Sequence, residues 1–238
     1  AEETLSRIEE ALLSFHGTYE MIAVNDGSLD DTLDILKNIA EKNNRLKIVT
    51  YSKNMGRGMA LRTGFKEAKG EIITSIDADL SYDPRYIADF FKTLEEEQDI
   101  DFLLASPYMP NGGVQNVPFL RHWISKLGNK ILRFAMPNRI YTSTGIFRAY
   151  RRRVLDSLEL ESDGKEIHLE VLSKALALGY RVKEVPAILT GRRKGKSKFK
   201  FKKTATSHLV FSVFEKPMIV FGFIGLLTLG IGFLIGIY

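Results

Sequence analysis

The chain has 238 residues, 45% hydrophobic and 26% charged, a composition that fits one globular domain with an appendage. The absence of cysteine excludes disulfides and thiolate metal sites, and the four scattered histidines argue against a histidine-bound zinc. The net charge of +5 is unevenly distributed, because much of the excess lies in residues 192–203, which indicates an anionic partner for that segment.

Strands and helices are expected to alternate along the chain. Short apolar runs bounded by turn residues predict strands at residues 19–24, 46–51, 71–76, 102–106, 142–150 and 181–185. Helical periodicity and capping residues predict helices at residues 4–15, 32–41, 60–68, 84–97, 119–136 and 168–178. This alternation predicts an α/β fold with a mostly parallel, Rossmann-like sheet, whose functional loops gather at the C-terminal edge of the strands.

Two carboxylates, Asp77 and Asp79, stand at the C-terminal end of the predicted strand between Gly70 and Pro84. Side chains two residues apart on an extended backbone point the same way, so both can face one hard cation or one ribose. Mg²⁺ and Mn²⁺ favour oxygen ligands and commonly bridge to substrate phosphates. The pair therefore suggests a divalent-metal site, and the alternative is that both residues merely solvate a turn.

A second acidic strand end is the sequence Val-Asn-Asp-Gly-Ser at residues 24–28. Asp26 in it can accept hydrogen bonds from a base or a ribose, or it can cap the next helix through an Asx turn. A glycine-bearing turn, Asn-Met-Gly-Arg-Gly, follows the next strand at residues 54–58. Arg57 in this turn can approach a diphosphate or remain a solvated surface arginine.

The C-terminal part of the chain has the pattern of a membrane protein. Residues 217–238 carry no charged side chain, and at about 1.5 Å per residue their length matches a hydrocarbon core of ~30 Å. They predict a transmembrane helix, alone or as the first of two or more. We expect a globular domain at 1–190, a basic juxtamembrane segment with an interfacial amphipathic helix (204–214) at 191–216, and the membrane span at 217–238. The basic run places the globular domain on the cytoplasmic face of the membrane.

Several motifs occur in a specific order over nearly the whole chain. They are the two already described, Asp-Ala-Asp-Leu-Ser-Tyr-Asp-Pro at 77–84, Pro-Phe-Leu-Arg at 118–121, Thr-Gly-Ile-Phe-Arg at 144–148, Glu-Val-Pro at 184–186 and Arg-Arg-Lys-Gly-Lys-Ser-Lys at 192–198. This order resembles the GT-A nucleotide-diphospho-sugar transferase fold of family-2 glycosyltransferases. The resemblance is closest to the polyprenyl-phosphate branch, that of dolichol-phosphate mannose or glucose synthases.

The resemblance implies a role for each matching residue. A nucleotide-diphospho-sugar donor would be bound by Asn25, Asp26, Asn54, Gly56, Arg57 and Asp77. A Mg²⁺ or Mn²⁺ ion that bridges the diphosphate would be held by Asp77 and Asp79. The phosphate of a polyprenyl (dolichyl or undecaprenyl) acceptor would lie among Arg121, Ser125, Arg192, Ser197 and Lys198. The residues expected to carry catalysis are Asp77, Asp79, Arg121 and Arg192.

The chain departs from this family pattern at several points. The family's first strand, which ends in Pro-x-Tyr-Asn-Glu, is absent, so we expect a truncated chain whose sheet lacks a member and whose nucleotide site lacks a wall. Pro107 stands where many relatives carry Arg, and Ser81 stands where some carry a metal-binding Gln. The Gln-x-x-Arg-Trp signature of processive polysaccharide synthases is missing, which argues against polymer synthesis.

The chemistry of the acceptor determines the expected mechanism. A sugar hydroxyl needs a general base because its pKa lies far above 7, whereas a phosphate monoester with a second pKa of ~6 is mostly a dianion at pH 7. We therefore predict inverting, in-line attack at the anomeric carbon of a hexose without a side-chain base. Cations would hold the acceptor and neutralise the leaving nucleoside diphosphate. The basic run would serve both as an anchor to membrane lipids and as an acceptor site.

Two rival functions remain open. Transfer to a hydroxyl-bearing lipid would require a base, and a non-catalytic membrane-anchored module on the same fold would bind without turnover. Phe199 and Phe201 alternate with lysines, a pattern also found in nucleic-acid binding, but we place these rings in the membrane interface and expect no nucleic-acid partner. The donor nucleotide, the hexose, the polyprenol and a homo-oligomeric state are left open.

Overall fold

The computed structural model describes residues 1–13, 15, 17–135, 140–191, 222, 225, 228, 229 and 232, without the side chains of 120, 121 and 131–135. The chain divides into two units, residues 1–196 and 197–238. Of the second unit, the described residues 222, 225, 228, 229 and 232 are helical. The expected interfacial helix at 204–214 and most of the expected span at 217–238 lie outside the described residues.

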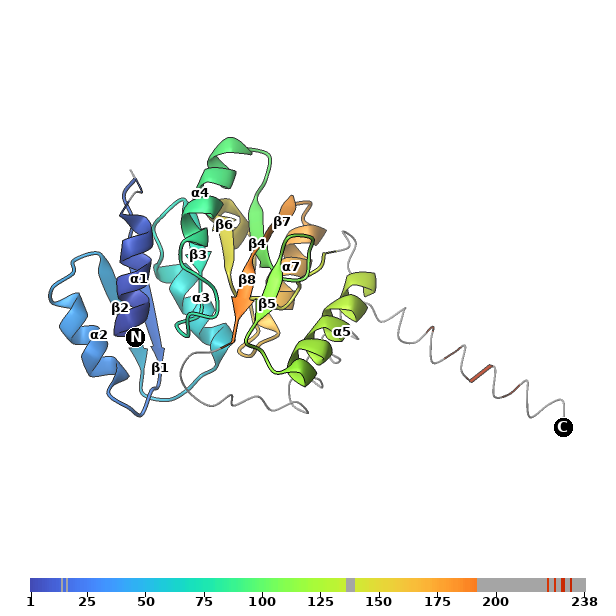
Figure 1. Ribbon diagram of the computed structural model, residues 1–238, viewed down its shortest axis with the longest axis horizontal. Helices are drawn as coiled ribbons and strands as arrows, with labels where there is room; N and C mark the ends of the chain where they lie inside the picture. Colours follow the sequence, from blue (N-terminus) through green and yellow to red (C-terminus); the bar gives the residue numbers. More distant parts are fainter. Residues whose placement is uncertain are drawn as a thin grey trace. The chain divides into compact units, whose positions relative to one another are not determined.

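Helices and strands alternate over residues 2–106, as the sequence predicts, and after these residues strands or helices also follow one another directly (Figure 1). In chain order they are α1 (Glu2–Leu12), β1 (Met21–Asp26), α2 (Thr32–Ala40), β2 (Leu46–Tyr51), α3 (Arg57–Glu67), β3 (Ile72–Ser75), α4 (Tyr86–Glu96), β4 (Phe102–Ser106), β5 (Gly113–Gln115), α5 (Phe119–Ala135), β6 (Arg148–Arg151), α6 (Arg152–Asp156), α7 (Ile167–Ala177), β7 (Val182–Pro186) and β8 (Ile188–Thr190).

The strands form three hydrogen-bonded groups. β1 pairs with β2 in parallel, a four-stranded sheet has the order β3-β6-β4-β7, and β5 pairs with β8 in parallel. β6 runs antiparallel to both of its neighbours, so the sheet is mixed rather than mostly parallel. The chain passes through α5 before it forms β6. It then enters the sheet between β3 and β4 from the end at which these two strands finish, so β6 runs in the opposite direction.

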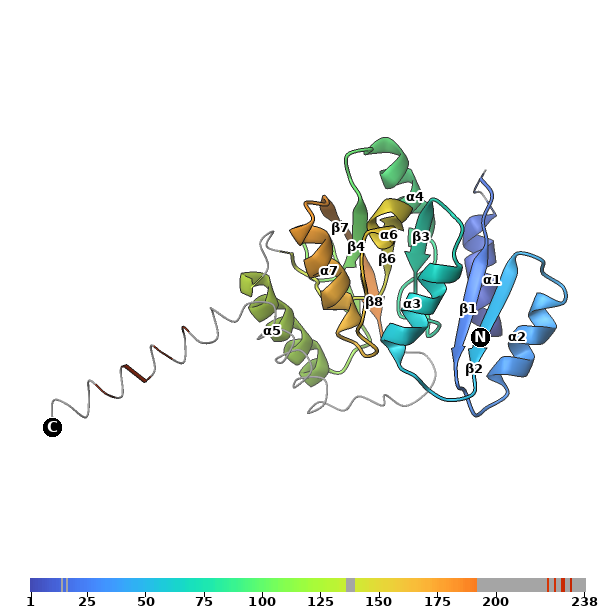
Figure 2. The same ribbon diagram turned by 180° about the vertical axis from the view of Figure 1, so that it is seen from behind.

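The core lies on both faces of the four-stranded sheet. Phe102 and Leu104 of β4 pack with helices α3, α6 and α7, which lie in front of the strands in Figure 2. The alternate residues Leu103 and Ala105 pack with α1 and α4. Because successive side chains of a strand point to opposite faces, every residue of β4 is buried. This layered arrangement is that of an α/β fold with helices on both faces of its sheet.

In the part of the chain that the structure describes, no helix combines the length and the apolar character needed to cross a bilayer. The expected span at 217–238 therefore stays a prediction.

Candidate active site

Asp26, at the end of β1, holds the glycine-bearing turn that follows β2. Its Oδ1 accepts a hydrogen bond from the Met55 amide (2.6 Å), and its Oδ2 accepts one from the Gly56 amide (3.0 Å). The side chain of Asn54 donates to the backbone carbonyl of Asp26 (3.0 Å). The structure thus brings together three predicted donor-site residues, because β1 and β2 are parallel and end at the same edge. The helix-capping alternative for Asp26 is not what is seen.

The glycine turn is packed tightly against the loop at residues 159–164. Gly56 has a φ of +99°, and a Cβ placed on it would lie 2.4 Å from the carbonyl oxygen of Asp163. The Gly58 amide donates to that same oxygen (2.7 Å). Arg62, one turn further along α3, donates to the carbonyl of Leu160 (2.9 Å) and pairs with the carboxylate of Asp163. Glycine is therefore required here for close backbone approach.

The acidic pair lies on a loop rather than on the strand. β3 ends at Ser75, and residues 78 and 79 form a turn. The extended-backbone argument for two parallel carboxylates is therefore wrong. Instead, Asp77 Oδ1 lies 3.4 Å from Arg57 Nη2, and Asp79 Oδ1 accepts a hydrogen bond from the Ser81 amide (3.0 Å). Both carboxylates are half-buried.

The two carboxylates of this loop fit a hard divalent cation that takes most of its ligands from water and substrate phosphates. In the described part of the chain, no group of three or more His, Asp or Glu side chains forms a metal cage. Mg²⁺ typically uses only one or two protein carboxylates together with water and substrate phosphates. Asp77 and Asp79 match that requirement, and Arg57 beside them supplies a further positive charge for a diphosphate.

The loop is anchored in the core and joined to β8. Tyr82 is buried against Phe147, with ring centroids 5.4 Å apart, and burial raises the pKa of its phenol. On the other side, the Thr190 amide at the end of β8 donates to the Ser81 carbonyl (2.8 Å), and the Gly191 amide donates to Gln115 (2.8 Å). The basic run begins at the next residue, Arg192. Thr190, two residues before Arg192, is thus hydrogen-bonded to the acidic loop.

Helix α5 contributes one predicted acceptor residue with a described side chain. The Ser125 hydroxyl accepts a hydrogen bond from the Tyr108 phenol (2.8 Å). Asn129, one turn on, accepts one from the Ser143 amide (2.9 Å). These contacts join α5 to the loop after β4 and to the loop before β6. Arg121 lies in α5, but its side chain is outside the described atoms, and Arg192, Ser197 and Lys198 lie outside the described residues.

Asn25, a predicted donor-binding residue, is buried between the ends of β1 and β2. Asn25 is 5% exposed, its amide donates to the Thr50 hydroxyl (3.0 Å), and its Oδ1 accepts from the Ser28 amide (3.3 Å). The side chain of Asn25 thus holds the ends of β1 and β2 together, and its contact with the donor stays a prediction.

Three charged residues that hold the site loops were not among the predicted site residues; Glu170 and Arg148 are buried and Glu184 is half-buried. Glu184 accepts hydrogen bonds from the Tyr141 and Thr142 amides, and Glu170 accepts them from the Glu161 and Ser162 amides. Fully buried Arg148 donates to the carbonyls of residues 143, 145 and 168. Their partners are backbone groups whose positions depend on how the loops fold, so no local sequence signal predicts these contacts.

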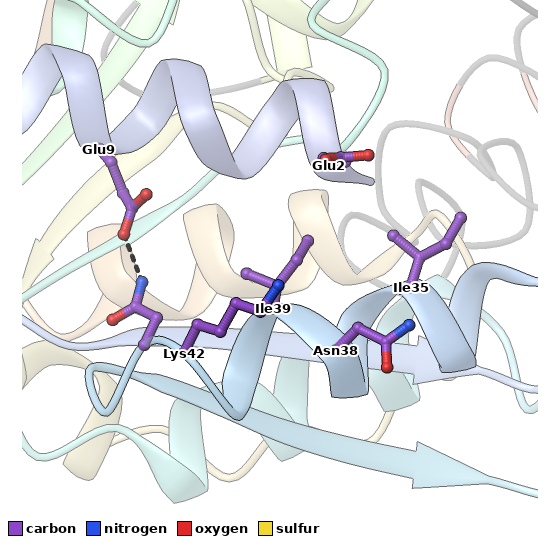
Figure 3. A pocket seen from close by; sticks show the side chains of 7 residues that line it. Glu2, Glu9, Ile35, Asn38, Ile39 and Lys42 are labelled. Carbon is purple, nitrogen blue, oxygen red and sulfur yellow. Dashed lines mark hydrogen bonds between the residues drawn. The ribbon is translucent and has the colours of Figure 1, made fainter.

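A surface hollow of about 510 Å³ lies between α1 and α2, away from the predicted site (Figure 3). Its lining combines charged, polar and apolar side chains, and the Asn43 side-chain amide donates a hydrogen bond to Glu9. None of its lining residues carries a predicted role, and they are Glu2, Glu9, Ile35, Asn38, Ile39, Lys42 and Asn43.

Solved structures resemble this fold over most of its length. Glucosyl-3-phosphoglycerate synthase from Mycobacterium tuberculosis, in complex with Mn²⁺, UDP-glucose and phosphoglyceric acid, has a TM-score of 0.63 and 17% identity, covering 90% of this chain and 74% of that one. Mannosyltransferase PcManGT from Pyrobaculum calidifontis, in complex with GDP-Man and Mn²⁺, has a TM-score of 0.60 and 21% identity, covering 89% and 58%. At these identities the likeness establishes a GT-A-like α/β fold.

Curated relatives are closer in sequence. A dolichol-phosphate mannosyltransferase of Pyrococcus furiosus is 34% identical over 203 residues, covering 84% of this chain and 56% of the relative. An uncharacterized glycosyltransferase of Synechocystis is 32% identical over 158 residues, covering 66% and 48%. The chain thus spans about half the length of the curated relatives it matches. The family model described as glycosyl transferase family 2 matches residues 1–159. On the combined evidence of this match, the relatives and the fold, the chain belongs to glycosyl transferase family 2.

Proposed function

We propose that the chain is the catalytic part of a membrane-bound glycosyltransferase that moves a hexose from a nucleotide-diphospho-sugar to a polyprenyl phosphate. The observation that carries the proposal is the hydrogen bond between Thr190 and Ser81, which brings the chain to the start of the basic run beside the acidic loop. A polyprenyl phosphate as acceptor is further supported by the name of the Pyrococcus relative, a dolichol-phosphate mannosyltransferase.

On the donor side, the described residues bind and orient a leaving diphosphate. Asp77 and Asp79 would hold Mg²⁺ or Mn²⁺, which neutralises charge on the departing nucleoside diphosphate. Asp26 fixes the glycine turn, and that turn places Arg57 beside Asp77. The guanidinium of Arg57 supplies positive charge at the place where the leaving diphosphate would develop negative charge.

On the acceptor side, the basic run and Arg121 would hold the lipid phosphate for in-line attack on the anomeric carbon. The nucleophile is already ionised near neutral pH, since the second pKa of a phosphate monoester is ~6. Inversion then requires no side-chain base, only two anions brought together by positive charge.

The test is product formation by the full chain in membranes. Radiolabelled UDP-glucose, GDP-mannose and UDP-N-acetylglucosamine are each offered with a short polyprenyl phosphate, with and without Mn²⁺. We expect one donor to yield a metal-dependent glycolipid. Asp79→Ala should abolish this product, while Asp89→Asn on the exposed surface of α4 should preserve it.

Two results would contradict the proposal. Equal transfer to the free polyprenol would identify a hydroxyl acceptor. Metal-dependent donor binding by calorimetry, without turnover of any donor, would favour a non-catalytic module.

A further inference from the structure

Helix α1 joins the two groups of strands that carry the donor side of the site. The β1-β2 pair, which leads into the glycine turn, and the four-stranded sheet, which leads into the acidic loop at residues 76–83, are separate hydrogen-bonded groups. α1 contacts both α2 and α4 and lies between them (Figures 1 and 2). Its Leu5 packs in one core cluster with Met21 of β1. Its Leu12 packs in another cluster, which contains Leu103 of β4.

The first two turns of α1 also bind the acidic loop directly. The Thr4 hydroxyl donates a hydrogen bond to the Ala78 carbonyl (2.7 Å), and Arg7, one turn on, donates to the Asp83 carboxylate (3.4 Å). A threonine in a helix often bonds to a carbonyl of its own helix. The hydroxyl of Thr4 instead binds a carbonyl 74 residues further along the chain, and Thr4 is only 7% exposed. This contact is therefore part of the tertiary structure rather than of the helix itself.

The Ala78 carbonyl lies at the centre of the acidic pair. It belongs to the peptide group that joins Ala78 to Asp79, and Asp77 precedes it. Because a peptide group is planar, a hydrogen bond to its oxygen restricts the backbone on both sides. The other printed contact of this turn is the hydrogen bond from the Ser81 amide to Asp79 Oδ1. Thr4 thus acts on the backbone from which both carboxylates project.

We propose that Thr4 is a positioning residue for the metal site. Through the Ala78 carbonyl, its hydroxyl holds the turn that directs Asp77 and Asp79 to one divalent cation. Carboxylates that share a cation must be kept at a spacing at which they repel each other in its absence, so their loop needs support from outside. A neutral hydroxyl gives this support without competing for the carboxylates, unlike a lysine or an arginine. The inference rests on the proposed function, which assigns the cation to this pair.

The test compares Thr4 with an isosteric residue that lacks the hydroxyl. Thr4→Val keeps the shape of the side chain, and the Ala78 carbonyl loses its donor. The affinity of the full chain in detergent for Mn²⁺, measured from free Mn²⁺ by electron paramagnetic resonance, should fall about fivefold, the effect of one lost hydrogen bond. Thr4→Ser retains a hydroxyl and should restore most of the affinity.

A second readout follows the loop without any metal. Hydrogen exchange of a peptide that covers residues 76–83, measured by mass spectrometry, should become faster in Thr4→Val and return towards the original rate in Thr4→Ser. Thr93→Val is the matched control, because the Thr93 hydroxyl donates to the Asp89 carbonyl within α4 (2.8 Å). It should change neither the exchange of this peptide nor the affinity for Mn²⁺.

Circular dichroism checks that each variant folds. Thr4→Ala also lacks the hydroxyl and favours a helix, so it provides the same two measurements if Thr4→Val does not fold.

Two outcomes would overturn the inference. One is an unchanged affinity for Mn²⁺ in the variants without the Thr4 hydroxyl, which would leave this residue a purely structural role. The other is an equal loss of affinity in Thr4→Ser, which would assign the effect to packing. Neither readout depends on turnover. An inactive chain whose Mn²⁺ affinity falls in Thr4→Val and returns in Thr4→Ser contradicts only the proposed function, and an active chain whose affinity ignores these changes contradicts only this inference.

Discussion

Arg57 lies beside Asp77, one of the two carboxylates proposed to hold a metal. Its guanidinium lies 3.4 Å from Asp77, both side chains being between a quarter and a third exposed. If Asp77 holds the proposed metal, the arginine competes with a divalent ion for the same carboxylate before a donor binds. Once a diphosphate is present, the arginine and the ion have separate partners and can act together.

This competition predicts the effect of Arg57→Gln on metal binding. Without nucleotide, the variant should bind Mn²⁺ more tightly by up to about fivefold, the equivalent of ~1 kcal/mol for a partly exposed ion pair. Titration of free Mn²⁺ by electron paramagnetic resonance measures this affinity. Arg181→Gln, which breaks an exposed pair with Asp99 elsewhere, serves as the control and should change nothing. Weaker Mn²⁺ binding in Arg57→Gln would show that the arginine supports the metal rather than competing with it.

At the scale of elements, the first turn of α3 is held by the loop before α7. Glu170 on α7 keeps this loop in place: although burial raises its pKa, hydrogen bonds from Lys174 and from the loop amides lower the pKa overall, so the carboxylate stays ionised near neutral pH. The loop in turn contacts both glycines of the turn. A Cβ on Gly58 would lie 2.0 Å from the Ser162 carbonyl oxygen.

Two alanine substitutions in α3 should therefore have opposite effects on stability. Gly58→Ala should lower the free energy of unfolding by about 2 kcal/mol because it forces the loop away. Gly64→Ala, whose Cβ would meet only Val24 Cγ2 at 3.6 Å, should raise it by up to about 1 kcal/mol through helix propensity. Urea denaturation in detergent measures both. A shift of the same sign and size in the two variants would contradict the assigned contact.

The sequence predicts elements better than it predicts their contacts. Apolar runs and capping residues located every strand of the four-stranded sheet, and the motif order indicated the family. β5, β8 and α6 were missed because each is only three to five residues long. The direction of β6 was missed because a strand's orientation depends on the path of the preceding chain. The turn at 78–79 was only the alternative interpretation, because Asp-Ala-Asp is compatible with both extended and turn backbone.

At the scale of the whole molecule, the proposed function requires an acceptor that ionises on its own. The rate of transfer should be nearly constant above pH 7 and should fall about tenfold per unit below pH ~6, as the acceptor phosphate becomes a monoanion. Donor binding, measured separately, should persist through this range, because the predicted loss of rate comes from the acceptor phosphate alone. Rates that keep rising between pH 7 and 9 would indicate a general base and a hydroxyl acceptor.

The hydrogen bond from Thr190 to Ser81 has a consequence for the order in which two substrates act. Ser81 also binds Asp79, so one residue links the acidic loop to the chain that leads into the basic run. If cations after Gly191 hold the lipid, the sugar donor and the lipid cannot associate independently. If one substrate strengthens the binding of the other, the second strengthens the binding of the first by the same free energy. A cell that supplies more lipid carrier would then also lower the donor concentration at which the enzyme is half-saturated.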